Sequence, residues 1–363
     1  MPRRTSYDRW LLIPCALLVL FGLFMVGSAT TYAASLSGSS VYHYVIVHLI
    51  HVTVGALAFA AFLQLPYQRL ADARIVLAGV AVSWICLACV LAMPAAGGAH
   101  RWLRLGPLVF QPSEIAKLVA ILFLAHLLAR HEADVNDVRR VVIPAALVLG
   151  PMAFLIVIEP DLGSALMLSI TAFVMLFVAG LRWKYVGVVV GAGVVGVVGA
   201  IIAEPYRMQR ILTFLNPAED TRRAGFQLAQ SLIALGSGGV TGTGWGQGQQ
   251  KAFYLPAAHT DFLYSVVGEE LGLLGTALLL AAFALLFWRG MRAAVGAPDR
   301  FGYYLALGIT TLVVFQGLIH MGVCLGLLPT KGLPLPFLSY GGSSLVATMA
   351  ATGLLVSVSR HSN

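Results

Sequence analysis

The chain has 363 residues, of which 59% are hydrophobic and 10% are charged, and its mean hydropathy is +0.87. Soluble domains carry roughly 25% charged residues, so this composition excludes an ordinary soluble enzyme. The formal net charge of +8 does not predict a nucleic-acid partner, because the basic residues stand in separate short segments and form no single basic patch. The sequence therefore predicts an integral membrane protein.

Ten apolar runs follow one another along the chain, each close to the length of about 20 residues that spans a bilayer. Backbone groups in hydrocarbon must form hydrogen bonds within their own segment, so each run predicts a membrane helix. The predicted fold class is an all-α polytopic integral membrane protein, with a single domain over residues 1–363. The runs cover residues 11–29, 45–62, 75–93, 115–129, 141–158, 162–180, 186–202, 262–288, 303–328 and 337–358.

The distribution of basic residues predicts how these helices are oriented. Of the 23 Lys and Arg residues, only Arg101, Arg104 and Lys331 lie in the short loops on one side of the predicted membrane. Fourteen lie on the other side, so the positive-inside rule places both termini in the cytoplasm. These fourteen are Arg3, Arg4, Arg9, Arg69, Arg74, Arg130, Arg139, Arg140, Arg182, Lys184, Arg289, Arg292, Arg300 and Arg360.

The longest connection, residues 203–260, is then a long extracytoplasmic loop between the seventh and eighth helices. Long loops are usually functional or disordered. Apolar residues such as Phe214, Phe226 and Trp245 argue against disorder, and we expect short helices on the outer surface. The glycine run 236–248 lacks the GK[ST] ending of a phosphate loop and predicts tight turns instead.

The four cysteines, Cys15, Cys86, Cys89 and Cys324, all fall within predicted spans. Cys86 and Cys89 have helical spacing, yet a metal site needs more soft ligands than this stretch offers. We therefore expect small apolar packing residues, with no disulfide and no metal site.

Charges that hydropathy does not explain gather at the outer face, and such charges in membrane proteins usually mark a functional site. Glu114 and Lys117 open the fourth predicted helix, with Arg101 and Arg104 just upstream. Ser113 can cap this helix, and Glu114 and Lys117 can pair at i, i+3. A structural ion pair and a component of a site are both open interpretations of this pair.

Two further groups of charges lie at the outer ends of helices. Glu159 and Asp161 stand in a very short connection, where they form a capped turn or part of a cavity wall, and the structural interpretation is favoured. Glu204, Arg207 and Arg210 open the long loop. Arg207 and Arg210, close to the helix end, are candidates for contact with an anion.

Asp261 follows His259 and Thr260 and immediately precedes a long apolar run, which is the position of a helix N-cap. On spacing alone, capping is its favoured role. Glu269 and Glu270 follow on the same predicted helix, about 12 Å deeper. Acids in lipid are costly and usually functional, and we expect Glu270 to pair with a neighbouring helix.

Carboxylates and arginines on the outer side, without a nucleotide motif, suit a substrate that arrives already activated. A lipid-linked sugar diphosphate fits, because its leaving group needs cations and its acceptor hydroxyl needs a general base. An ion-coupled transporter would also collect intramembrane acids, so both classes are open from the residues alone.

Several long motifs resemble, in order, those of the SEDS family of FtsW, RodA and SpoVE. The resemblance covers nearly the whole chain. The matching stretches are RWLRLGPLVFQPSEIAK (101–117), EPDLGSA (159–165), EPYRMQRILTFLNP (204–217), GFQLAQS (225–231), KAFYLPAAHTDFLYSVVGEELG (251–272) and GLLPTKGLPLPFLSYGGSS (326–344).

The resemblance implies an inverting peptidoglycan glycosyltransferase that polymerises lipid II at the outer face of the bacterial cytoplasmic membrane and releases undecaprenyl diphosphate. The family's essential acid stands in the HTDF stretch, so Asp261 becomes the expected catalytic residue. No cofactor is implied, and assistance by a divalent cation is open. The expected substrate-binding residues are Arg101, Arg104, Glu114, Lys117, Glu204, Arg207, Arg210 and Lys331.

The resemblance also bears on subtype and partners. Thr330 and Lys331 in the PTKG stretch resemble FtsW, so a role in cell division is favoured over RodA-like elongation. The implied partners are a class B penicillin-binding protein transpeptidase and other division proteins. A lipid II flippase is the alternative activity. It would need polar side chains that continue toward the cytoplasmic half, where His126 is the exception to an apolar sequence.

Overall fold

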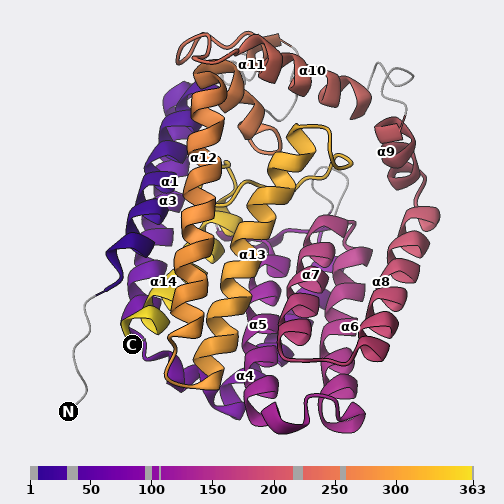
Figure 1. Ribbon diagram of the computed structural model, residues 1–363. Helices are drawn as coiled ribbons and strands as arrows, with labels where there is room; N and C mark the ends of the chain where they lie inside the picture. The colour runs from indigo at the N-terminus through magenta and orange to yellow at the C-terminus, as the bar shows by residue number, and fades with distance from the viewer. Residues whose placement is uncertain are drawn as a thin grey trace.

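The computed structural model describes residues 7–30, 40–94, 100–105, 108–215, 224–253 and 259–361. Figure 1 shows an upright bundle of helices. A helix lies at each of the ten predicted spans, which confirms an all-α polytopic membrane protein. They are α1 (Arg9–Ala29), α3 (Val41–Gln64), α4 (Ala73–Leu91), α5 (Pro112–Arg130), α6 (Ile143–Ile158), α7 (Leu162–Val178), α8 (Trp183–Ala203), α12 (Leu263–Val295), α13 (Arg300–Cys324) and α14 (Gly342–His361).

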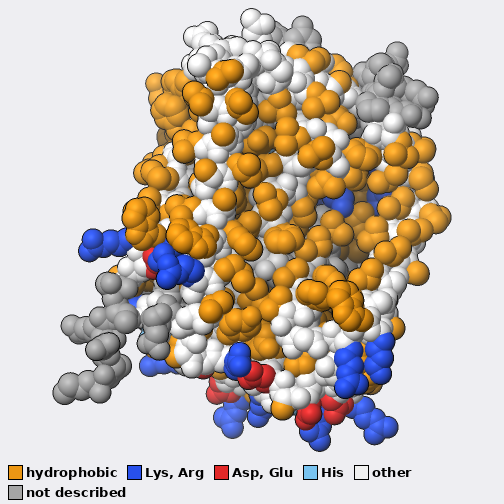
Figure 2. Space-filling model, in the orientation of Figure 1, with side chains coloured by type: hydrophobic (Ala, Val, Ile, Leu, Met, Phe, Trp, Pro, Cys, Tyr) orange, Lys and Arg blue, Asp and Glu red, His pale blue; other side chains and the backbone are white. Residues whose placement is uncertain are grey.

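Nine stretches of the described chain are helical, long and apolar enough to cross a membrane, and α7 is a shorter apolar helix of 17 residues. Hydrophobic side chains cover most of the face shown in Figure 2, and most of its Lys and Arg side chains gather at the lower end. Large apolar residues such as Leu57, Phe154 and Val195 are 67%, 65% and 72% exposed. An apolar surface of this extent is typical of contact with lipid.

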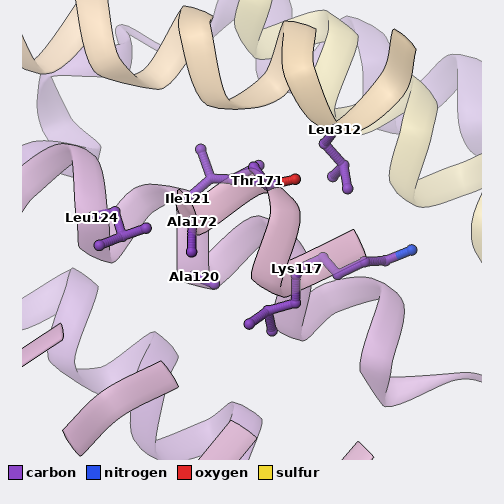
Figure 3. Close-up of a pocket in the computed structure, with 8 residues that line it drawn as sticks. Lys117, Ala120, Ile121, Leu124, Thr171, Ala172 and Leu312 are labelled. Atoms are coloured by element: carbon purple, nitrogen blue, oxygen red, sulfur yellow. The ribbon is translucent and has the colours of Figure 1, made fainter. Parts of the chain in front are cut away.

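Helix α13 forms the centre of the bundle, because 83% of the residues in its most apolar stretch are buried. In α3 and α8, at the rim, the buried share is 11%. Small residues allow this close packing. A Cβ atom at Gly308 of α13 would lie 2.6 Å from Ile121 of α5 and 2.7 Å from Met175 of α7. Between these three helices remains a gap too narrow for a water molecule, lined by apolar side chains, Thr171 and Lys117. In Figure 3 the amine of Lys117 points away from Leu124.

Short elements connect these helices. Helix α9 (Pro205–Leu215), α10 (Ala224–Ser237) and α11 (Gln250–Phe253) lie in the long loop, which confirms the expected short helices; Figure 1 shows α10 and α11 above the bundle. The turns predicted from the glycine run are also confirmed, with Gly239, Gly242, Gly244 and Gly246 at positive φ. The strands β1 (Leu103–Leu105) and β2 (Leu108–Phe110) pair antiparallel before α5. The remaining turns are η1 (Tyr67–Ala71), η2 (Glu132–Asp134) and the π-helical η3 (Val138–Val142).

Helix α12 is not the straight rod that the apolar run predicted. Gly272 adopts φ 65° and ψ −158°, which breaks the helix. A Cβ atom at Gly275 would lie 3.4 Å from Val267, whereas residues eight apart in a straight helix are separated by about 12 Å. The segment 263–271 therefore folds back along 273–295, and the prediction that Glu269 and Glu270 lie deeper in the membrane than Asp261 was wrong.

The tip of this hairpin receives its backbone partners from the glycine-rich loop. The nitrogens of Thr243 and Gly244 donate to the carbonyls of Glu269 (2.9 Å) and Glu270 (3.0 Å). In the other direction, the Leu273 nitrogen donates to the carbonyl of Gly239 (2.9 Å). A break within an apolar helix leaves backbone groups unpaired, and this loop pairs them.

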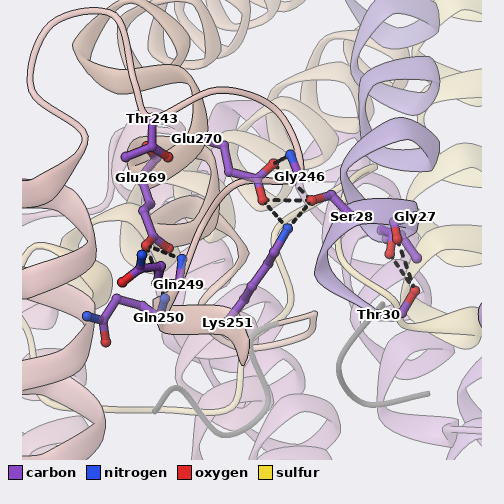
Figure 4. Close-up of polar contacts among 11 residues, drawn as sticks. Gly27, Ser28, Thr30, Thr243, Gly246, Gln249, Gln250, Lys251, Glu269 and Glu270 are labelled. Atoms are coloured by element: carbon purple, nitrogen blue, oxygen red, sulfur yellow. Dashed lines mark hydrogen bonds and ion pairs between the residues drawn. The ribbon is translucent and has the colours of Figure 1, made fainter. Parts of the chain in front are cut away.

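The side chains of the tip are paired as well. Glu270 forms a buried ion pair with Lys251 of α11, and Ser28 of α1 donates to its two carboxylate oxygens at 2.6 and 2.9 Å. The nitrogen of Gly246 donates to Glu270 at 3.0 Å, and Glu269 accepts from the nitrogen of Gln249 at 2.6 Å. Figure 4 shows how these groups converge. The expectation that Glu270 pairs with a neighbouring helix is confirmed. The ion pair also joins the two ends of the stretch 251–270, which contains Asp261.

The last predicted span, 337–358, begins later than its hydropathy indicated, because α14 starts at Gly342. Residues 325–341 form turns and extended chain. Pro329, Pro334 and Pro336 lack the N–H that a helix requires. This irregular segment lies next to Asp261, where it forms part of the candidate site.

We expect Gly272→Ala to destabilise the protein. An L-residue in this backbone conformation is strained by about 1–3 kcal/mol, and its Cβ atom would lie 2.4 Å from the Gly242 nitrogen and 2.5 Å from the Val240 carbonyl oxygen. The apparent melting temperature in detergent should therefore fall. Gly196→Ala is the matched control, because a Cβ there meets nothing within 4 Å. A melting temperature of Gly272→Ala equal to that of the control would contradict the hairpin.

Lys251→Met should destabilise the protein more than the double variant Lys251→Met/Glu270→Gln. Removing one partner of a buried pair typically costs about 3–5 kcal/mol, because the other charge is left uncompensated. The double variant removes that charge and keeps an oxygen that can accept from Gly246. The exposed pair Arg140–Asp137 is the control, and its loss through Arg140→Met should cost about 0–1 kcal/mol. Equal losses of thermal stability in the single and double variants would count against a buried charge.

Candidate active site

A cavity of about 380 Å³ lies beside Asp261, among the ends of α7, α8 and α9 and the irregular segment 329–332. It brings together charged residues from five separate parts of the sequence. Most belong to the set predicted from sequence, and the cavity also includes Asp161. The charged residues that line it are Arg101, Asp161, Arg207, Arg210, Asp261 and Lys331.

Asp261 does not cap α12. The N-cap position belongs to Phe262, and the described residues supply no side-chain capping bond there. Burial raises the pKa of Asp261 to about 6, while Arg210, a hydrogen bond from Thr260 and Arg101 act in the opposite direction. A carboxylate with a pKa close to neutral is suited to accept and release a proton.

The absence of a side chain at Gly332 lets the backbone approach Asp261. A Cβ atom at Gly332 would lie 3.3 Å from the Oδ2 atom of Asp261. Both residues line the cavity, so the carboxylate faces a narrow space bounded by backbone. A substrate hydroxyl that enters this space would meet the carboxylate directly.

Three cations in the cavity keep hydrogen-bond donors available. Arg210 donates to the carbonyl of Thr330 at 3.2 Å, and Arg101 donates to the carbonyls of Glu159 and Pro160. An arginine has five N–H donors, so each retains free ones. Lys331 makes no hydrogen bond or ion pair among the described residues, and its pKa is lowered by burial and by Arg210. Together these groups can bind a multiply charged anion such as a diphosphate.

Arg207 is engaged differently from Arg210. Its guanidinium donates to the carbonyls of Ala200 in α8 and Val157 in α6, both at 2.9 Å, and to the Tyr206 hydroxyl at 3.1 Å. It is 6% exposed. These bonds favour a structural role, in which Arg207 fixes α9 to the ends of two membrane helices.

Asp161 lines the cavity, whereas the neighbouring Glu159 does not. Asp161 caps α7 through the nitrogen of Ser164 (3.0 Å) and accepts from Gln111 (2.7 Å), as the favoured structural interpretation expected. Glu159 is fully buried, and its carboxylate oxygens have no partner in the described part of the chain. Burial and Asp161 raise the pKa of Glu159 to about 8, against the effect of Arg101, so this acid is largely protonated at neutral pH.

Glu114 and Lys117 do not line the cavity. They form the predicted i, i+3 ion pair at 2.9 Å, and both are buried. The N-cap of α5 is Gln111, so the expected cap by Ser113 was wrong; Ser113 donates to Asp161 at 3.4 Å instead.

Gln316 and His320 of α13 link this layer to the site, and sequence reasoning missed them. Gln316 accepts from Lys117 at 3.3 Å and donates to the carbonyl of Pro334 at 3.0 Å. His320 contacts the carbonyl of Leu333 at 2.7 Å through Nδ1. They therefore hold the chain that carries Lys331. The signal was present, because Gln316 and His320 stand four residues apart in an apolar span, where polar residues are rare.

Arg104 and Glu204 complete the predicted set. Both are exposed, Arg104 on β1 and Glu204 at the C-cap of α8, and neither lines the cavity. Across residues 7–30, 40–94, 100–105, 108–215, 224–253 and 259–361, no group of three or more His, Cys, Asp or Glu side chains could hold a metal ion.

Curated proteins with similar sequences cover almost the whole chain. Stage V sporulation protein E of Bacillus subtilis (strain 168) is 38% identical in an alignment 367 residues long, which covers 99% of each chain. A probable peptidoglycan glycosyltransferase FtsW of Geobacter metallireducens is 39% identical over 357 residues, covering 97% of this chain and 94% of that one.

Solved structures agree with the fold and with the resemblance seen in the motifs. A chain of a complex described as coordinating polymerization and crosslinking in peptidoglycan synthesis has a TM-score of 0.80 at 32% identity, with 98% of each chain covered. The rod shape determining protein RodA of Thermus thermophilus has a TM-score of 0.71 at 30% identity, covering 98% and 97%. The family model of FtsW, RodA and SpoVE, a family of cell cycle proteins, matches residues 9–363. The chain therefore belongs to the FtsW, RodA and SpoVE family.

Proposed function

We propose that this protein is a peptidoglycan glycosyltransferase of the division type, which polymerises lipid II into glycan strands. The observation that carries the proposal is the cavity in which Asp261 faces the cations of Arg101, Arg210 and Lys331. A general base and an anion site within one cavity are the two requirements of transfer from a sugar diphosphate.

In the proposed reaction, Asp261 removes the proton from the 4-hydroxyl of the acceptor sugar as that oxygen attacks the anomeric carbon of the donor. The bond from this carbon to the diphosphate breaks, and undecaprenyl diphosphate leaves. The donor is α-linked and the strand is β-linked, so one displacement with inversion suffices and one base is needed. Arg101, Arg210 and Lys331 offset the negative charge that develops on the leaving group.

The four predicted residues outside the lined cavity take supporting roles in this proposal. Glu114 and Lys117 hold Gln316 beneath the segment of Lys331. Arg104 and Glu204 are exposed at the outer end of the protein, where they can contact substrate before it enters. A divalent cation that accompanies the diphosphate would meet the carboxylates of Asp161 and Asp261, which both line the cavity.

The proposed partner is a transpeptidase that crosslinks the new strand. One similar chain comes from a complex described as coordinating polymerization with crosslinking, and a polymerase alone leaves strands uncrosslinked. The alternative of a flippase has less support. His126, the polar residue that such a path would use toward the cytoplasm, is engaged with the carbonyl of Ala71 at 2.8 Å.

We further propose that the cavity opens on the outer side of the cytoplasmic membrane. Most Lys and Arg side chains gather at the lower end in Figure 2, and the start of α1 and the end of α14 lie toward that end in Figure 1. Positive charge is retained in the cytoplasm. Helices α9, α10 and α11 lie toward the opposite end, where lipid II is polymerised.

Asp261→Asn should abolish polymerisation of purified lipid II, with a loss of about 10² to 10⁴ in rate, because an amide cannot accept the proton. In the unsubstituted protein only the ionised carboxylate is a base. Since the pKa of Asp261 is raised to about 6, activity should fall as the pH drops through about 6. An ordinary aspartate would place that limb near pH 4.

The controls for Asp261→Asn are its melting temperature and its co-purification with the transpeptidase, both of which should be unchanged. Arg210→Gln should also lower the rate, but it should leave the acid limb of the pH profile in place or move it upward, because a cation that favours ionisation is lost. Polymerisation at the normal rate by well-folded Asp261→Asn would refute the assignment of the base.

Ser237→Cys should react with a membrane-impermeant thiol reagent in intact cells, because α10 lies in the loop proposed to face outward. Its hydroxyl bonds only locally, to the carbonyl of Ala234, so the change is mild. Ala133→Cys, in the exposed turn between α5 and α6, is the matched control and should react only in broken cells. The reverse labelling pattern would show that the protein has the opposite orientation in the membrane.

A further inference from the structure

The turn formed by residues 335–340 is strained and deeply buried. Phe337 adopts φ 68° and is 1% exposed, and this region of φ is uncommon for a residue other than glycine. The nitrogens of Leu338 and Ser339 both donate to the carbonyl of Leu335, at 3.2 and 3.0 Å. Strained backbone that persists in this way is over-determined by its surroundings and often serves a functional site.

Helix α1 supports this turn from behind. A Cβ atom at Gly22 would lie 2.7 Å from both the Cα atom of Leu338 and the carbonyl oxygen of Phe337. Only glycine allows the backbone of α1 to approach the turn so closely. Helix α1 therefore packs directly against the backbone of the turn.

On its other side the turn is bonded to the chain that carries Asp261. The Ser339 hydroxyl accepts from the nitrogen of Leu335 at 2.8 Å and donates to the carbonyl of Thr260 at 2.7 Å. The nitrogen of Tyr340 donates to the carbonyl of His259 at 3.0 Å. Two bonds from consecutive residues of the turn thus hold the two residues that immediately precede Asp261.

Side-chain packing reinforces these bonds. The ring of Tyr340 lies 5.7 Å from that of His259 and stacks on His48 of α3 at 5.8 Å. By contrast, the direct contact to the Asp261 carbonyl is weak, because its donor is the thiol of Cys324 at 3.8 Å. The backbone of Asp261 therefore takes its position mainly from Ser339 and Tyr340.

We propose that Ser339 is a positioning residue for the catalytic acid: its hydroxyl joins the strained turn to Thr260 and so fixes where the Asp261 carboxylate lies in the cavity. This proposal rests on the proposed function of Asp261 as the base. A displacement of about 1 Å at a reacting group can cost 10²-fold in rate. Loss of the hydrogen bond from Ser339 should therefore lower the rate of polymerisation.

The test compares Ser339→Ala with Ser339→Thr, which keeps the hydroxyl, and Ser339→Cys, which keeps the volume with a weaker donor. Ser357→Ala is the matched control. Ser357, in α14, is 1% exposed and donates to the carbonyl of Leu65 at 2.9 Å. Ser357→Ala therefore removes the same kind of hydrogen bond at a residue that does not line the cavity. Each purified protein is assayed for lipid II polymerisation between pH 5 and 8, for melting temperature, and for amide hydrogen exchange in peptides covering 259–263 and 335–341.

Ser339→Ala should polymerise about 10- to 100-fold more slowly, with Ser339→Cys between it and wild type and Ser339→Thr close to wild type. Exchange should rise in both peptides, because the Leu335 amide loses its acceptor and the bond of Tyr340 to His259 loosens. The acid limb should move to lower pH, because a loosened carboxylate gains water. Ser357→Ala should change none of these.

Three outcomes would overturn the proposal: unchanged exchange in Ser339→Ala, raised exchange with an unchanged rate, or equal slowing in Ser357→Ala. The exchange measurement does not depend on catalysis, so it separates this proposal from the one before it. Asp261→Asn could polymerise normally while exchange still rises in Ser339→Ala. The structural role of Ser339 would then be supported, and the assignment of Asp261 as the base would be wrong.

Discussion

A backbone N–H or carbonyl in hydrocarbon has no water to bond to, and the architecture around Asp261 follows from that constraint. The chain leaves helical geometry at Gly272, at residues 259–262 and at residues 325–341. In each place, backbone partners come from another segment. The glycine-rich loop serves the hairpin of α12, and the turn containing Ser339 serves the chain before Asp261. Of this irregular backbone, Asp261 and residues 329–332 line the cavity.

The cations of the cavity affect both the pKa of Asp261 and the binding of an anion. Burial raises the pKa of Asp261 to about 6, while Arg210, a hydrogen bond from Thr260 and Arg101 act in the opposite direction and favour the carboxylate. The same cations present donors toward any anion that enters. A substrate diphosphate would partly neutralise them, which would make Asp261 more basic as the donor binds. Binding of the leaving group and activation of the base are thereby coupled through Arg210.

Sequence alone predicted the ten membrane helices, the short helices of the long loop and five of the six charged residues that line the cavity, because hydropathy and the motifs report these directly. It failed where the decisive quantity was a single backbone angle. Nothing in an apolar run distinguishes Gly272, which reverses the chain, from Gly308, which lets helices pack. Sequence also did not show how Arg207 is engaged, because a charge in a motif does not reveal that carbonyls at the ends of α8 and α6 accept from its guanidinium.

The bond from Ser339 to Thr260 spans 79 residues of sequence, and this has a consequence for biogenesis. A ribosome delivers α12 to the membrane long before it has made the turn that holds the chain of Asp261. Until that turn arrives, and α1 closes on it at Gly22, the acid has no fixed place beside the cations. A nascent chain that ends before Ser339 lacks the two bonds that hold His259 and Thr260, so the position of Asp261 is completed only late in synthesis.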